Sequence, residues 1–163
     1  NFWDDIIDTK ETQDDNSYFI IWRDRNGGIL NFPLDIVIDM NKQIIVNRFV
    51  VWQRAYWYTT DGSMDNEHYC YQVENLKSFD LFASNDLNEW LLLGQFDIGD
   101  PKDEDGNVPP EKLQEAIDGH EFELPETSDP FRYMKFSITS NFGSETYVHG
   151  SEITLYGLDN VTK

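Results

Sequence analysis

The stretch that decides the fold is SNDLNEW, residues 84–90, which separates two short apolar runs. Asn and Asp side chains accept hydrogen bonds from nearby backbone N–H groups in turns, and Asn tolerates a left-handed backbone. We therefore expect Asn85 and Asp86 to cap a turn and Asn88 to take the left-handed conformation. The sequence predicts a β-hairpin that reverses here and places Trp90 in the core on the returning strand.

Alternation of apolar and polar residues indicates that strands dominate the chain. Phe79, Leu81 and Ala83 would share one face of a strand whose other face is mostly polar, the pattern of an antiparallel sheet with one solvated side. Polar turn clusters separate the apolar runs. The predicted strands are residues 18–22, 34–39, 44–53, 69–73, 77–84, 90–97, 121–124, 131–139 and 151–156.

One segment has the pattern of a helix. Residues 109–120, PPEKLQEAIDGH, begin with prolines, carry Leu113, Ala116 and Ile117 at helical spacing, and reach Gly119 as a stop. Nine short strands and one short helix predict an all-β fold, a two-sheet antiparallel β-sandwich of the jelly-roll type. The 163 residues carry no internal repeat or linker. We expect one domain, 1–163, excised from a longer chain.

Charge limits the classes of partner. The chain has 31 acidic and 12 basic residues, a net charge of −19. Nucleic acids and anionic membranes need a basic face, so neutral or cationic partners such as sugars, calcium or basic proteins are favoured. The alternative is that the acidic excess only keeps the domain soluble. No run of 18 apolar residues exists for membrane insertion, and a single cysteine, Cys70, excludes an intrachain disulfide.

Several motifs resemble those of a known family in the same order. SNDLNEW resembles the S-x-D-G-x-x-W turn of discoidin domains, or coagulation factor 5/8 type C domains. Residues 34–54 (LDIVIDMNKQIIVNRFVVWQR), 131–138 (FRYMKFSI) and 150–157 (GSEITLYG) resemble the family's other strands. The resemblance implies a galactose-binding-like β-sandwich, similar to family 32 carbohydrate-binding modules. Leu87 departs from the pattern, because that position of the turn usually has Gly.

Two further motifs narrow the resemblance, namely WQR at 52–54 and GHEF at 119–122. Both are similar to motifs in discoidin-like domains of outer-surface lipoproteins from gut Bacteroidetes. Arg132 and Tyr133 belong to the family's strand signature, so a structural role is expected for them. The remaining expectation concerns tryptophans, since Trp3, Trp22, Trp52 and Trp90 are all predicted to lie in the core.

A calcium ion is implied by the same resemblance. Many family members hold calcium between the first loop and a glutamate at the start of the last strand, where hard oxygen ligands converge. The matching positions here are Asp4 and Asp5, with Asp8 or Thr9 as further candidates, and Glu152. Asp5 stands where the first loop often has Asp-Gly. The alternative is an acidic loop facing water and a glutamate that caps or pairs with an arginine.

The resemblance implies a sugar site at one end of the sandwich, where the family's topology brings two such aromatic-rich loops together. Sugars present apolar C–H faces and hydroxyl rims, which flat aromatic rings and flanking polar groups recognise. Residues 54–71 and 139–149 carry such side chains. The expected ligand-binding residues are Arg54, Trp57, His68, Asn141, Phe142, Tyr56 and Tyr147. The alternative is that alternate aromatics of 56–58 and 69–71 continue strands and pack inward.

The resemblance implies a non-catalytic carbohydrate-binding module of a cell-surface protein that handles polysaccharides. No H-E-x-x-H, G-x-S-x-G or phosphate-binding glycine loop is present in the sequence. A protein–protein docking module and, with less support, a small glycan hydrolase are the alternatives. The implied location is the outer cell surface, through a lipid anchor on a preceding segment, or else the periplasm. The domain is expected to be monomeric within a larger protein.

Overall fold

The computed structural model describes residues 18–22, 28–58, 64–124 and 129–159. Its elements in chain order are β1 (Phe19–Trp22), β2 (Leu34–Val51), β3 (Tyr56–Tyr58), β4 (Met64–Tyr69), β5 (Leu76–Ser84), β6 (Leu91–Asp97), α1 (Pro110–Asp118), β7 (His120–Glu123), β8 (Phe131–Asn141), β9 (Tyr147–Gly150) and β10 (Ile153–Asp159).

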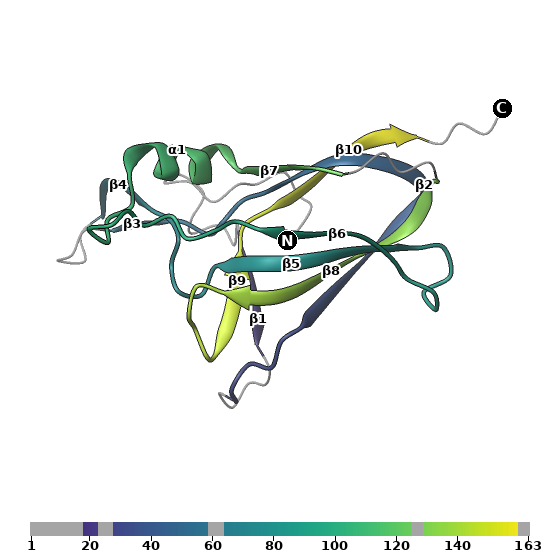
Figure 1. Ribbon diagram of the computed structural model, residues 1–163, viewed down its shortest axis with the longest axis horizontal. Helices are drawn as coiled ribbons and strands as arrows, with labels where there is room; N and C mark the ends of the chain where they lie inside the picture. The colour runs from purple at the N-terminus through teal and green to yellow at the C-terminus, as the bar shows by residue number, and fades with distance from the viewer. Residues whose placement is uncertain (1–17, 23–27, 59–63, 125–128, 160–163) are drawn as a thin grey trace.

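The long strand β2 takes part in both layers of the fold (Figure 1). Its first half pairs with β8, from Leu34 opposite Ile138 to Asp39 opposite Tyr133. The pairing shifts between Asp39 and Ile44, where Asn41 has a φ of 60°. The second half of β2 pairs with β10 and β7. The sheet with the strand order β10-β2-β8-β5-β6 therefore bends at β2 into two facing layers. The predicted all-β sandwich is confirmed.

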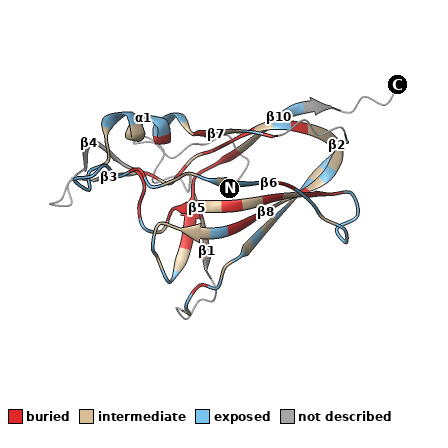
Figure 2. Cartoon of the chain, viewed as in Figure 1, coloured by how far each residue is buried: buried red, intermediate tan, exposed pale blue. Residues whose placement is uncertain are grey.

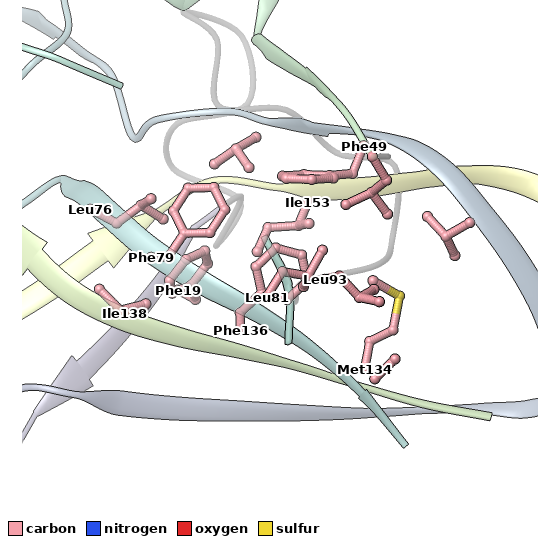
Figure 3. Close-up of a cluster of buried hydrophobic side chains, with 14 of the residues drawn as sticks. Phe19, Phe49, Leu76, Phe79, Leu81, Leu93, Met134, Phe136, Ile138 and Ile153 are labelled. Carbon is pink, nitrogen blue, oxygen red and sulfur yellow. The ribbon is translucent and has the colours of Figure 1, made fainter. Parts of the chain in front are cut away.

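Phenylalanine rings from both layers fill the space between the sheets. Phe49 of β2 is fully buried. Its ring centroid lies 5.8 Å from Phe79, 5.0 Å from Phe96 and 5.7 Å from Phe136, all in edge-to-face arrangements. Figure 3 shows Phe49 in one cluster with Phe79 and Phe136. Figure 2 shows buried residues along β2, β5 and β8. Each buried ring of this kind stabilises the fold by roughly 1.5–3 kcal/mol.

The hairpin forms as expected, although its capping residues differ in part from the prediction. Asp86 Oδ1 accepts hydrogen bonds from the backbone N–H groups of Asn88 (2.9 Å) and Glu89 (3.0 Å), so its capping role is confirmed. Asn85 instead contacts β8, where its Oδ1 accepts from the Arg132 backbone N–H at 3.1 Å. The left-handed residue is Leu87, with φ of 66°, not Asn88.

The core prediction was wrong for two tryptophans. Trp90 is half-buried outside the core cluster, and its ring lies 4.8 Å from the Lys135 ammonium. It borders a 410 Å³ hollow beside the hairpin. Trp52 is also half-buried and covers Gly119, where a Cβ would lie 2.6 Å from the indole. Both rings pack at the edge of the sandwich. Trp3 and the Trp22 side chain lie outside the described residues.

Strand boundaries differ where the chain bends or where side chains replace sheet hydrogen bonds. The predicted strands 34–39 and 44–53 form one bent strand. The predicted strand 69–73 is wrong beyond Tyr69, because Tyr71 has φ of 57° and its N–H donates to Gln53 Oε1 at 3.0 Å. Three strands were not among those predicted, namely β3, β9 and all of β4 except Tyr69.

The helix α1 confirms its predicted start and stop. Pro110 is its first residue and Gly119, at φ of 91°, ends it. Ala116 is buried against Ala55, Cys70 and Tyr71, whereas Ile117 is exposed, so the expected apolar face is narrower than predicted.

Candidate functional site

α1 and the β3–β4 hairpin lie at one end of the sandwich (Figure 1). Asn75, the residue before β5, joins chain segments near the start of this hairpin. Its fully buried side chain accepts a hydrogen bond from the Arg54 N–H at 3.0 Å and donates to the Arg54 carbonyl at 2.9 Å. Its own carbonyl accepts from the Phe142 N–H at 3.3 Å, and Ser144 N–H donates to the Val73 carbonyl. The two regions predicted to form the site are therefore both hydrogen-bonded to Asn75, one through Arg54 and the other through Phe142.

A pocket of about 240 Å³ opens at this junction. It is lined by Tyr71, Val73, Lys77, Asp100, Pro101, Lys102, Asn141, Phe142 and Gly143. The aromatic, ammonium, carboxylate and amide groups in this lining can contact both an apolar face and polar substituents of one small ligand.

Phe142 is half-buried, and its ring packs against Tyr71 and Lys77. It meets Tyr71 edge-to-face at 5.7 Å, and the Lys77 ammonium lies 5.6 Å from its centroid. Tyr71 in turn donates its hydroxyl proton to the Lys112 carbonyl of α1 at 2.9 Å. Burial, and secondarily the negative charge of Glu115, raises the pKa of Tyr71 above its usual range, so this hydroxyl stays protonated. The helix thus fixes the base of the pocket.

Asn141 borders the pocket but mainly holds its own loop together. Its side-chain N–H groups donate to the carbonyls of Ser144 (2.9 Å) and Tyr147 (3.3 Å). Its Oδ1 accepts from the Gly143 N–H at 2.9 Å. These bonds give the loop its shape and present Phe142 at its tip.

Arg54 and Tyr147 form a second group, which does not line the 240 Å³ pocket. The Arg54 guanidinium carbon lies 3.4 Å from the centroid of the Tyr18 ring, and the rings of Tyr147 and His149 are 5.9 Å apart. Burial, with a smaller effect from the Arg54 charge, lowers the pKa of His149 to about 3. Burial, then the Glu74 charge, raises the pKa of Tyr147. His149 is therefore neutral in the folded protein.

Three predicted sugar-binding residues lie on the β3–β4 hairpin, whose backbone alone is described. Tyr56 pairs with Tyr69 and Tyr58 with Met64 across the hairpin. The side chains of Tyr56, Trp57 and His68 lie outside the described residues, and their contact with a sugar stays a prediction.

Of the predicted calcium ligands, only Glu152 is described. It is 1% exposed at the start of β10, and its backbone carbonyl accepts from the Trp52 N–H at 2.9 Å. Asp4 and Asp5 lie outside the described residues, as do Asp8 and Thr9. Across the described ranges, no three His, Cys, Asp or Glu side chains are gathered as a metal site. A deeply buried carboxylate needs a cation or hydrogen-bond donors, so Glu152 fits a metal ligand chemically.

Sequence reasoning missed Lys77, Lys102 and Asp100 in the pocket. Lys77 is the second residue of β5, and the other two lie in an acidic stretch that resembles solvated surface. The positive charge of Lys102 within that stretch was the available signal. Within the part of the chain that the structure describes, no helix has the length and apolar character needed to cross a membrane.

Comparisons with solved structures confirm the galactose-binding-like discoidin fold. The SusE-like protein BT2857 is 25% identical, with a TM-score of 0.61 over 80% of this chain, which spans 50% of that protein. CBM32-3 from a Clostridium perfringens family 31 glycoside hydrolase is 16% identical, with a TM-score of 0.57, 93% of this chain covered and 83% of that one. The C-terminal domain of a Bacteroides fragilis chitobiase is 19% identical, with a TM-score of 0.54 and coverage of 87% and 73%.

Sequence comparison identifies the family of the chain. No curated protein matches the chain significantly. The family model of DUF5000, described as a domain of unknown function, matches residues 8–157 and so covers nearly the whole chain. The chain therefore belongs to the DUF5000 family and has a discoidin-like fold.

Proposed function

We propose that this domain binds carbohydrate without catalysis. The observation that carries the proposal is the pocket in which the Phe142 ring stands among Lys77, Asp100 and Lys102. A pyranose packs its C–H face on such a ring and hydrogen-bonds its hydroxyl groups to the surrounding charged side chains. A shallow site of this kind binds with dissociation constants of about micromolar to millimolar.

Similar structures support the proposal. A further Clostridium perfringens module, CpGH89CBM32-5, was solved in complex with GalNAc-β-1,3-galactose, and it shares the fold at a TM-score of 0.53 and 13% identity over 85% of this chain and 75% of that one. A docking module would present exposed aromatic rings without converging polar groups. The charged groups around Phe142 favour a sugar ligand over that alternative.

The location follows from the same resemblance. We place the domain on the outer cell surface, as a monomeric part of a larger protein that handles polysaccharides. The SusE-like protein and the Bacteroides fragilis chitobiase domain among the similar structures support this placement. Detection of the full-length protein by antibody on intact cells, and its loss after external protease treatment, would test it.

The calcium ion remains part of the proposal. Glu152 would supply a buried carboxylate oxygen, with Asp4 and Asp5 as the proposed partners from the first loop. Such an ion would hold the first loop against the last strand and would stabilise the fold by binding only the folded state.

The experiment is a glycan array on the isolated domain, followed by calorimetric titration of a glycan that binds. Phe142→Ala is expected to weaken binding about two- to thirteenfold, the range of a lost ring contact of about 0.5–1.5 kcal/mol. Tyr156→Ala is the matched control, because Tyr156 is an exposed aromatic residue of β10 that does not line the pocket. Full affinity of Phe142→Ala would refute this site. A blank array with a folded domain would favour the docking alternative.

A further inference from the structure

Two lysines in the pocket differ from the other described basic residues in their ion pairing. A carboxylate oxygen lies 2.6–3.7 Å from the charged nitrogen of Arg48, Lys112, Arg132 and Lys135. Lys42 and Arg54 have further contacts of their own. Among the described residues, Lys77 and Lys102 have no carboxylate within 4.0 Å, and both line the same 240 Å³ pocket.

The backbone holds these two lysines on one pocket. Lys77 is the second residue of β5, and its carbonyl accepts a hydrogen bond from the Ile98 N–H at 3.0 Å. This bond ties the segment after β6 to the start of β5. Pro101 is buried, and Lys102 N–H donates to Asp100 Oδ1 at 3.1 Å. The side chains of Lys77 and Lys102 are therefore presented by two neighbouring segments beside Phe142.

The pairing pattern indicates an external anion. With 31 acidic residues in the chain, an ammonium group has many carboxylates to pair with, and four of the described cations do so. Asp100 is the only acidic residue among the described residues that line the pocket, and its Oδ1 already accepts a backbone hydrogen bond. The overall charge of −19 opposes an anion at long range, but charges beyond about 8 Å are largely screened at physiological ionic strength.

We propose that the pocket binds an acidic glycan, whose sugar ring packs on Phe142 while its carboxylate or sulfate group pairs with Lys77 and Lys102. This inference rests on the proposed carbohydrate-binding function and adds the class of sugar. Charge-assisted hydrogen bonds to the ammonium groups would select the acidic glycan over a neutral one of the same shape.

The test is binding to uronate-containing and sulfated glycans, each beside its carboxyl-reduced or desulfated counterpart. The acidic forms are expected to bind about tenfold more tightly at physiological ionic strength, in the range of two partly exposed ion pairs. The double variant Lys77→Gln/Lys102→Gln should lose this preference, and Lys77→Arg/Lys102→Arg should keep it. Lys42→Gln, which removes one exposed positive charge of β2 outside the pocket, should leave it intact. Thermal unfolding confirms that each variant folds.

The outcomes separate the two proposals. Preference for uronates or for sulfated glycans, lost only in the Gln double variant, supports the inference and identifies the acidic group. Equal binding of neutral counterparts, or a preference that survives in the Gln double variant, overturns it while the carbohydrate-binding function stands. Binding of no glycan by the folded domain overturns both.

Discussion

His149 links the stability of this domain to pH between neutrality and pH 5. The residue is fully buried in β9, and burial lowers its pKa from an ordinary 6.5 to about 3, with a smaller contribution from Arg54. The folded protein holds the neutral imidazole, whereas the unfolded chain takes up a proton below pH 6.5. The stability contributed by His149 is therefore present above pH 6.5 and is lost as the pH falls toward 3.

The size of the effect follows from the two pKa values. At pH 5 the unfolded imidazole is about 1.5 pH units below its ordinary pKa, and each unit corresponds to about 1.36 kcal/mol. His149 should therefore remove about 2 kcal/mol from the free energy of unfolding between pH 7 and pH 5. Hydrogen bonds lower the pKa of Asp39, Asp86 and Glu115, so these carboxylates stay ionised between pH 7 and pH 5. The stability that they contribute is lost only at lower pH.

The assay is urea unfolding at pH 7 and pH 5 for the wild-type domain and His149→Gln. Burial also lowers the pKa of His120, so the wild-type loss includes a second histidine and the difference between the two proteins isolates His149. We expect that difference to be about 2 kcal/mol. An unchanged pH dependence in the variant would refute the reasoning. In wild-type protein, an NMR titration of the His149 ring with a midpoint near 6.5 would do the same.

Two further predictions concern stability. Gly157→Ala should cost about 3 kcal/mol, because the new Cβ would lie 1.9 Å from the Ile45 carbonyl oxygen, whereas Gly99→Ala, with open space and φ of 82°, should cost about 1 kcal/mol. Equal losses in urea unfolding would contradict this steric explanation. Millimolar calcium should raise the Tm above that in EDTA by about 5–10 °C, and Glu152→Gln should abolish the rise. An equal wild-type Tm in calcium and in EDTA would refute the proposal of a calcium site.

Local alternation predicted most strands because it records which face of each strand meets the core. Phe79, Leu81 and Ala83 are all buried, as their spacing indicated. The errors lie where long-range contacts decide. Asn85 could cap its own turn, but the backbone of Arg132 satisfies its side chain instead. The left-handed position falls on Leu87, and the family pattern with glycine at that position was the better guide than the general tolerance of asparagine.

Sequence reasoning placed aromatic and polar residues near the pocket but did not indicate its charged residues. Asn141 and Phe142, two of the predicted sugar-binding residues, line the pocket, and their contact with a sugar stays a prediction. Whether a lysine pairs with a carboxylate depends on neighbours far along the chain, as the contact between Lys135 and Asp35 illustrates. The expected convergence of all the chosen residues is not seen among those described, because Arg54 and Tyr147 group around Tyr18 and His149.

The bent strand β2 has a consequence for how the domain unfolds. Its first half is hydrogen-bonded to β8 and its second half to β7 and β10, so neither layer is complete without the same continuous segment of chain. Opening one layer exposes the rings around Phe49 that cover the other. Amide protons of β8 and β10 should therefore exchange with solvent through the same global opening, and the two layers behave as one cooperative unit.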